Sequence, residues 1–346
     1  MKSGLGSSCC RTDRSHSPGL MRAEDAVQQE HRADSFHSSP KHKHVRQNDA
    51  DEPQLTTREG EAVEEEGRFP YRFFVVTFAW SWLIWLPLVL AGAGIIPLGR
   101  DLLNAVTVPW IALGVFGPAA GAFYCLRTSR GKGAVREYLR GLLDLRFGWR
   151  AWLAPPLVLG GTTWLAWVLP ELWGAPRLKM LLPSVWVFLP YLLLMIFLGG
   201  GQEELGWRGY ILDPLEERLG PWLGNLVLGV VWAVWHAPLV LIPGTSQRFV
   251  PFVGFALVLI GYSYFFAAIR AAAGKRTMAG LVAHGWGNAF VPLFPTIVMA
   301  EGAAQQRYWI WAGLTLLAGV LAMIVRLRRA GPKPASSVDP PDSSAT

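Results

Sequence analysis

Long apolar runs are the feature that most constrains the fold of this chain. A helix that crosses the hydrocarbon core of a bilayer needs about 20 residues. Eight runs of roughly that length occur, at approximately 71–90, 107–126, 151–169, 183–201, 221–242, 251–269, 277–298 and 308–325. Because backbone polar groups must find internal partners in lipid, these runs predict an all-α, polytopic membrane helical bundle of about eight transmembrane helices.

The residues that flank the runs have a different composition. Residues 1–68 are rich in Ser, Arg, His, Asp and Glu, and they offer little apolar surface to offset the entropy of ordering them. We therefore expect a disordered cytoplasmic extension there, a membrane domain at 69–329 and a short disordered tail at 330–346. The net charge of +7 does not indicate a nucleic-acid partner, because the basic residues of the membrane domain are spread over short loops.

The distribution of loop charge predicts an orientation in the cell membrane. Lys and Arg accumulate on the cytoplasmic side of membrane proteins. They crowd the connection at 127–150, the connection at 270–276 and the segment at 326–333, whereas each alternate loop holds only one or two. The pattern predicts a multi-pass protein whose termini are both cytoplasmic.

Two further patterns are typical of the membrane surface. In the connection after the second run, apolar residues at helical spacing lie opposite charged ones, which predicts an interfacial amphipathic helix. Its apolar members are Val135, Tyr138, Leu139, Leu142 and Leu143. Six tryptophans near run ends are expected to anchor those ends at the interface: Trp149, Trp152, Trp173, Trp222, Trp309 and Trp311.

Ionisable residues at membrane depth are costly, so each one is a candidate for function. The clearest set, Glu203, Glu204 and Arg208, directly follows the fourth apolar run, and we consider a helix that continues from that run past Gln202. In a helix, Glu204 and Arg208 can pair on one face while Glu203 points about 100° away. The pattern predicts one neutralised carboxylate and one free carboxylate. The alternative interpretation is a helix end with ordinary surface charges.

Two histidines, His236 and His284, fall inside predicted spans. Trp232 lies one helical turn before His236, and Asn288 lies one turn after His284, so each pair shares a face. A single histidine in an apolar segment is more often a packing residue. Here, however, three separate spans contribute groups that can activate water and stabilise an oxyanion. Their convergence would produce hydrolysis of an amide by activated water.

These residues resemble the motifs of the CPBP family of intramembrane endopeptidases, which includes the CAAX prenyl proteases and the bacterial Abi and bacteriocin-processing relatives. The motif Glu-Glu-x-x-x-Arg appears as Glu203, Glu204 and Arg208. The motif Phe-x-x-x-His appears with Trp232 in the aromatic position, and His-x-x-x-Asn ends at Asn288. The resemblance covers roughly residues 73–326, and it identifies 69–329 as a CPBP-like intramembrane protease domain.

The resemblance also implies a role for each motif residue. The implied roles are general base for Glu203, water binding for His236, electrostatic support for Glu204 and Arg208, polarisation of the scissile carbonyl for His284 and Asn288, and the substrate-binding wall for Trp232. The implied partners are the lipid bilayer and a membrane-associated peptide or protein substrate. A cofactor is left open, since Glu and His can activate water alone, yet they are also zinc ligands. The chain has neither a His-Glu-x-x-His zinc motif nor a Gly-x-Ser-x-Gly elbow.

Two other function classes are compatible with buried polar residues. A transporter also places charges between helices, but it often shows matched halves with interrupted spans, and the sequence has no such symmetry. A non-catalytic membrane scaffold or immunity-type protein would keep the fold and tolerate the loss of Glu203.

The orientation can be tested with a thiol probe that does not cross membranes. In a chain whose three native cysteines are replaced by serine, Arg248→Cys should be labelled on intact cells and Arg140→Cys should be labelled only after permeabilisation. The reason is that residue 140 lies in the basic connection and residue 248 in a charge-poor loop. Labelling of Arg140→Cys but not Arg248→Cys on intact cells would reverse the assigned orientation.

Overall fold

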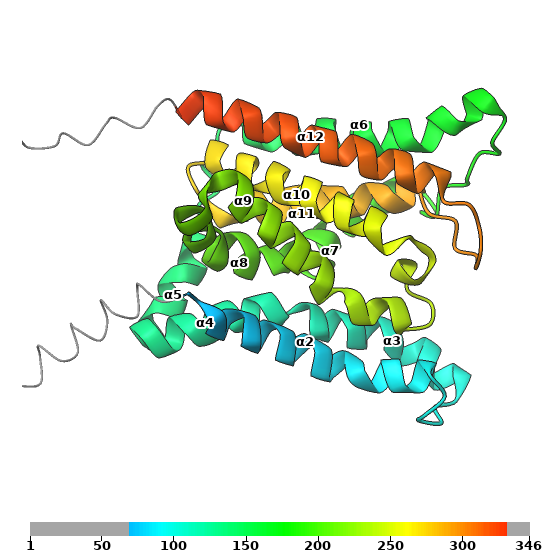
Figure 1. The fold of residues 1–346 in the computed structure, drawn as a ribbon, viewed down its shortest axis with the longest axis horizontal. Coiled ribbons are helices and arrows are strands. Elements are labelled where there is room, and N and C mark those ends of the chain that lie inside the picture. Colours follow the sequence, from blue (N-terminus) through cyan, green and yellow to red (C-terminus); the bar gives the residue numbers. More distant parts are fainter. Residues whose placement is uncertain (1–68, 331–346) are drawn as a thin grey trace, which may run out of the picture. The chain divides into compact units, whose positions relative to one another are not determined.

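The computed structural model describes residues 69–330, and the regular elements of this part are all helices. The expectations of disorder at 1–68 and at 331–346 lie outside the described residues, whereas Ala330, the first residue of the predicted tail, is the last residue of α12. The α-helices are α2 (Tyr71–Gly92), α3 (Arg100–Val115), α4 (Gly117–Arg130), α5 (Lys132–Gly141), α6 (Trp149–Val168), α7 (Phe188–Phe197), α8 (Glu204–Gly206), α9 (Leu212–Trp235), α10 (Phe252–Ala272), α11 (Thr277–Leu293) and α12 (Gln306–Ala330) (Figure 1). The predicted all-α polytopic class is confirmed.

Six stretches of the described chain are long and apolar enough to cross a membrane. One of them, Phe188–Leu241, includes both α7 and α9. The predicted spans of the chain agree with the helices to within several residues at most ends, but the count of eight stays a prediction. Side chains such as Leu83 (67% exposed), Val108 (75%) and Leu157 (70%) project outward from α2, α3 and α6, as lipid-facing residues do.

The second predicted span, 107–126, lies within the candidate span Asp101–Arg130. The structure has two helices there, α3 and α4, and they meet at Phe116. Pro118 lies in the first turn of α4, where its missing N–H costs no helical hydrogen bond. Proline is therefore tolerated at the new helix start, whereas it would interrupt a continuous helix.

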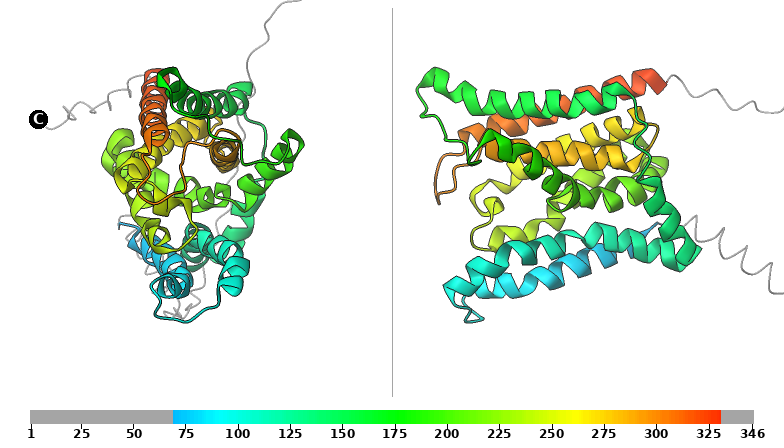
Figure 2. Two further views of the ribbon diagram at one scale, coloured as in Figure 1. Left: turned by 90° about the vertical axis from the view of Figure 1, so that its right-hand side faces the viewer. Right: turned by 180° about the vertical axis from the view of Figure 1, so that it is seen from behind.

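The helices pack as two groups joined by the short elements around residue 205. α2 packs against α3 and α4, whereas α10 packs against α9, α11 and α12. α11 also contacts α6 and α7. Figure 2 shows α2, α3 and α4 along one side and α6 and α12 along the other, with α10 and α11 between. α8 contacts both α4 and α11, so this short element connects the two groups.

Ion pairs join the loops that the charge pattern assigned to one side. Asp144, which follows α5, binds Arg276 at 2.9 Å at the start of α11. Hydrogen bonds from Arg146, and then from Arg276, hold the pKa of Asp144 below its ordinary value. Among the charge-poor loops, Arg248 pairs with Glu301. Each of these two ion pairs joins segments that the charge pattern assigns to the same side.

The interfacial elements agree with the sequence in part. α5 overlaps the predicted amphipathic stretch and has no fully buried residue, but it ends at Gly141, so the predicted members Leu142 and Leu143 lie beyond the helix. Five of the six tryptophan anchors are at least partly exposed, but Trp311 is only 6% exposed. The anchor assignment of Trp311 is therefore wrong. Its ring packs against Tyr262 and Tyr308, because α12 turns this position toward α10 instead of toward lipid.

The α2–α4 contact depends on two glycines one turn apart. A Cβ on Gly117 would collide with Ser81, and one on Gly121 would lie 2.9 Å from the carbonyl oxygen of Phe73. Small residues at this spacing let helix backbones approach closely in membranes. The contact is therefore set by the absence of side chains on one helix face.

Gly121→Ala should destabilise the protein by about 1–3 kcal/mol, since the new methyl group overpacks the α2–α4 contact. Gly161→Ala on α6 is the matched control, because its Cβ would meet nothing within 4 Å. Thermal unfolding in detergent, followed by tryptophan fluorescence, measures both variants. Equal unfolding temperatures for the two variants would contradict the close-packing account.

Candidate active site

A break after α7 positions the acidic motif. Gly200 has φ +128° and ψ −36°, a conformation that side-chain-bearing residues rarely adopt. The amide of Gly200 donates to Gln202 Oε1 at 2.9 Å, and Gln202 Nε2 donates to the Leu198 carbonyl at 3.0 Å. The amide side chain thus satisfies backbone groups that the broken helix leaves without partners. The continuous helix through Gln202 considered above is therefore wrong.

The motif continues through short turns of three kinds. A 3₁₀ turn (Gly201–Glu203) leads into α8, which is followed by a π-helical turn (Trp207–Ile211) and then by α9. π-Helical turns are rare and occur frequently at functional sites. Glu203, Glu204 and Arg208 all lie in this segment and are at most 3% exposed. They are not ordinary surface charges at a helix end.

Glu204 links the acidic motif to α11. Its carboxylate lies 3.0 Å from Arg208 Nη1, the predicted pairing four residues apart. The same carboxylate lies 2.9 Å from His284 Nδ1. Arg208 also stacks over the rings of Trp232, at 4.8 Å, and Phe266, at 5.2 Å. A single buried carboxylate therefore connects a cation on the π turn with an imidazole on another helix.

Glu203 takes part in a separate contact. The indole N–H of Trp232 donates to Glu203 Oε2 at 2.7 Å, and the Trp232 carbonyl lies 2.9 Å from His236 Nδ1. Because a carbonyl can only accept, Nδ1 must carry the proton, and in a neutral ring the lone pair is then on Nε2. Trp232 thus contacts both Glu203 and His236, a closer involvement than the wall role that the resemblance implies. His236 is the C-cap residue of α9 and lies within the candidate span Phe188–Leu241, as predicted.

Asn288 and His284 converge beside the chain break. Asn288 Nδ2 donates to the Gly199 carbonyl at 2.8 Å. A Cβ on Gly200 would collide with Asn288 Nδ2 and would lie 2.7 Å from His284 Nε2. Asn288 Nδ2 and His284 Nε2 therefore both lie next to the position that a Cβ of residue 200 would take, so only glycine fits there.

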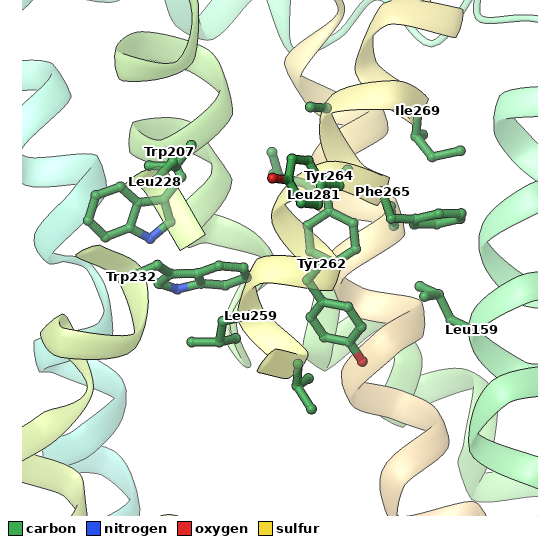
Figure 3. Packing of buried hydrophobic residues seen from close by; sticks show 14 of the residues in the cluster. Leu159, Trp207, Leu228, Trp232, Leu259, Tyr262, Tyr264, Phe265, Ile269 and Leu281 are labelled. Carbon is green, nitrogen blue, oxygen red and sulfur yellow. The ribbon is translucent and has the colours of Figure 1, made fainter. Parts of the chain in front are cut away.

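A cavity of about 380 Å³ lies at the site, and only some of the site residues line it. Glu203, Trp232, His236, His284 and Asn288 line it, whereas Glu204 and Arg208 do not. Most other lining residues are apolar or aromatic, including Leu259 and Tyr262, which Figure 3 shows together with Trp232. The cavity has the size and mainly apolar lining common to ligand pockets, with a smaller number of polar groups in its wall.

The site residues do not form an ordinary zinc site. Within residues 69–330, no group of three or more His, Cys, Asp or Glu side chains is arranged to share a metal ion. His284 Nδ1 is directed to Glu204, and Glu204 is neutralised by Arg208. A structural zinc site needs four ligands and a catalytic one usually needs three.

Three contributors were missed at the level of the sequence. Gly200 and Gln202 stabilise the chain break after α7. The ring of Phe266 covers the guanidinium group of Arg208. The run of three glycines at 199–201 was an available signal for the break, because glycines favour positive φ. Phe266 gave no signal, since it lies in an apolar run.

The fold and these residues define a polytopic helical membrane protein with a buried carboxylate–histidine cluster. Residues 184–290 match the family model described as Type II CAAX prenyl endopeptidase Rce1-like. CAAX prenyl protease 2 of Methanococcus maripaludis is 38% identical over 60 residues, which is 17% of this chain and 22% of that protein. Over residues 184–290 the chain is thus similar to the CAAX prenyl endopeptidases, in agreement with the resemblance drawn from the three motifs.

Arg208→Ala should lower stability by about 3–5 kcal/mol, because it leaves the fully buried Glu204 carboxylate without its cation. Adding Glu204→Gln should restore part of that loss by removing the unpaired charge. Thermal unfolding of the single and double variants measures the coupling. Lys179→Ala, at an exposed site, is the control, and a double variant less stable than Arg208→Ala would contradict the pairing account.

Proposed function

We propose that this chain is an intramembrane endopeptidase that hydrolyses a peptide bond in a membrane-associated peptide or protein. The observation that carries the proposal is the composition of the cavity wall. A carboxylate, two imidazoles and an amide line an otherwise largely apolar cavity. These are the groups needed to activate water and to stabilise an oxyanion. The match to CAAX prenyl endopeptidases supports the same reaction class.

Glu203 is the general base in this proposal. It receives a hydrogen bond from Trp232 and forms no ion pair with a described cation, so it stays able to accept a proton. His236, with Nδ1–H on the Trp232 carbonyl, offers Nε2 to the same water. Glu203 removes a proton as the water oxygen attacks the scissile carbonyl carbon.

His284 and Asn288 stabilise the oxyanion. Asn288 uses one N–H for the Gly199 carbonyl and has a second to donate. His284 donates from Nδ1 to Glu204, and its imidazolium form also donates from Nε2. When the C–N bond breaks, the proton taken up by Glu203 passes to the leaving nitrogen, and the products are a carboxylic acid and an amine.

The substrate class follows from the cavity and from the position of the site. Apolar side chains such as Val258, Leu259 and Val291 line the cavity, so apolar substrate side chains can be buried beside the reacting groups. A segment that is already at the membrane reaches such a site without crossing bulk water. We propose that the substrate is therefore membrane-associated.

Glu203→Gln should lower hydrolysis by about 10²-fold or more and leave the fold intact, because it removes the base but keeps the shape. Membranes that carry the intact chain or this variant can be compared by proteomic detection of new peptide termini. Glu217→Gln, at an exposed position on α9, is the matched control.

His236→Ala should be similarly severe, and Asn288→Ala should cost roughly 10²–10³-fold in turnover through the lost oxyanion donor. Chelation followed by zinc addition tests the metal alternative on the same substrate. Full activity of Glu203→Gln on a verified substrate would end the assignment of Glu203 as base.

A further inference from the structure

A second cavity lies apart from the candidate active site. It is a groove of about 660 Å³ between α4 and α5, and no active-site residue lines it. Gly131, with φ +80°, turns the chain between the two helices, and the rings of Phe123 and Tyr138 pack edge to face across them at 6.1 Å. The apolar side chains along the groove include Val135, Leu139 and Leu143.

Basic side chains make up the polar part of this lining. They are Arg127, Lys132, Arg136 and Arg140, all exposed. No Asp or Glu lines the groove, and none of the four forms an ion pair within residues 69–330. In the same connection, by contrast, Arg146 pairs with Asp144. Four cations around an apolar surface thus have no acidic partner in the described chain.

This combination matches the chemistry of one ligand class. An acyl chain is buried by apolar side chains, and an anionic headgroup is attracted by several Lys and Arg residues at the membrane surface. We propose that the groove between α4 and α5 binds an anionic phospholipid, with its headgroup at Arg127, Lys132, Arg136 and Arg140. The net charge of the headgroup provides the selectivity over zwitterionic lipids.

The groove is connected to the acidic motif through Tyr138 of α5. Its hydroxyl donates to the Leu205 carbonyl at 2.6 Å, next to Glu204 in the chain. A Cβ on Gly209 would collide with the same hydroxyl, so Tyr138 also packs on the π turn. A lipid that holds α5 in place therefore stabilises the segment that carries Glu203 and Glu204.

The chain itself contains another anionic candidate. The segment at 59–66 holds five glutamates and precedes α2 in the sequence. Its charges suit the basic residues, but it offers only Ala62 and Val63 for the apolar part of the groove. The lipid satisfies both parts and is favoured for that reason.

Native mass spectrometry of the full-length protein tests the proposal with phosphatidylglycerol and phosphatidylcholine as probes. Phosphatidylglycerol should bind more tightly, and Arg136→Gln with Arg140→Gln should weaken its binding by about tenfold or more. Arg328→Gln with Arg329→Gln is the matched control, since these exposed arginines lie at the end of α12, outside the groove. The control should retain the affinity of the intact chain.

Equal losses in the two double variants would overturn the site, because they would reflect general surface charge. Equal binding of the two lipids would overturn the headgroup selectivity. If phosphatidylglycerol binds only after residues 1–67 are removed, the acidic segment occupies the groove and the lipid proposal fails. The measurement needs no proteolysis, so its failure is distinct from a failure of the proposed peptidase activity.

Discussion

The buried contact of Glu204 with Arg208 and His284 is the interaction on which the rest of the site depends. Arg208 and Glu204 are fully buried, and each would be strongly unfavourable at membrane depth without the other. His284 brings α11 into the same contact, so the acidic motif and the second histidine cannot be placed independently. The carboxylate of Glu203 is left to face the cavity because its neighbour in the chain takes the arginine.

Glycines allow the helices to close around that contact. A Cβ on Gly206 would collide with the Pro118 carbonyl of α4, and one on Gly209 would collide with Tyr138 of α5. The segment is therefore fitted against α4 and α5 by absent side chains, as expected where lipid provides no hydrophobic drive for helix association.

The polar residues of the site differ in whether they line the cavity. Glu203, His236, His284 and Asn288 reach the cavity, and the ion pair lies behind them. This division is what the proposed hydrolytic site requires, because in that proposal cavity-lining groups contact the substrate and buried groups orient them. The chain spans about a fifth of the length of the curated relative it matches, and the family model matches residues 184–290, the segment that carries these residues.

The sequence by itself determined the all-α membrane class, the grouping of basic loops and the identity of the polar residues, because hydropathy and the cost of buried charge act on each segment locally. The Glu204–Arg208 pairing was likewise local, since it needs only helical spacing. The tertiary structure alone decided that Trp232 holds Glu203, that His284 reaches Glu204 and that Trp311 turns inward. These contacts join residues on different helices, and helix rotation and depth are set by packing between helices, which spacing along one chain segment does not encode.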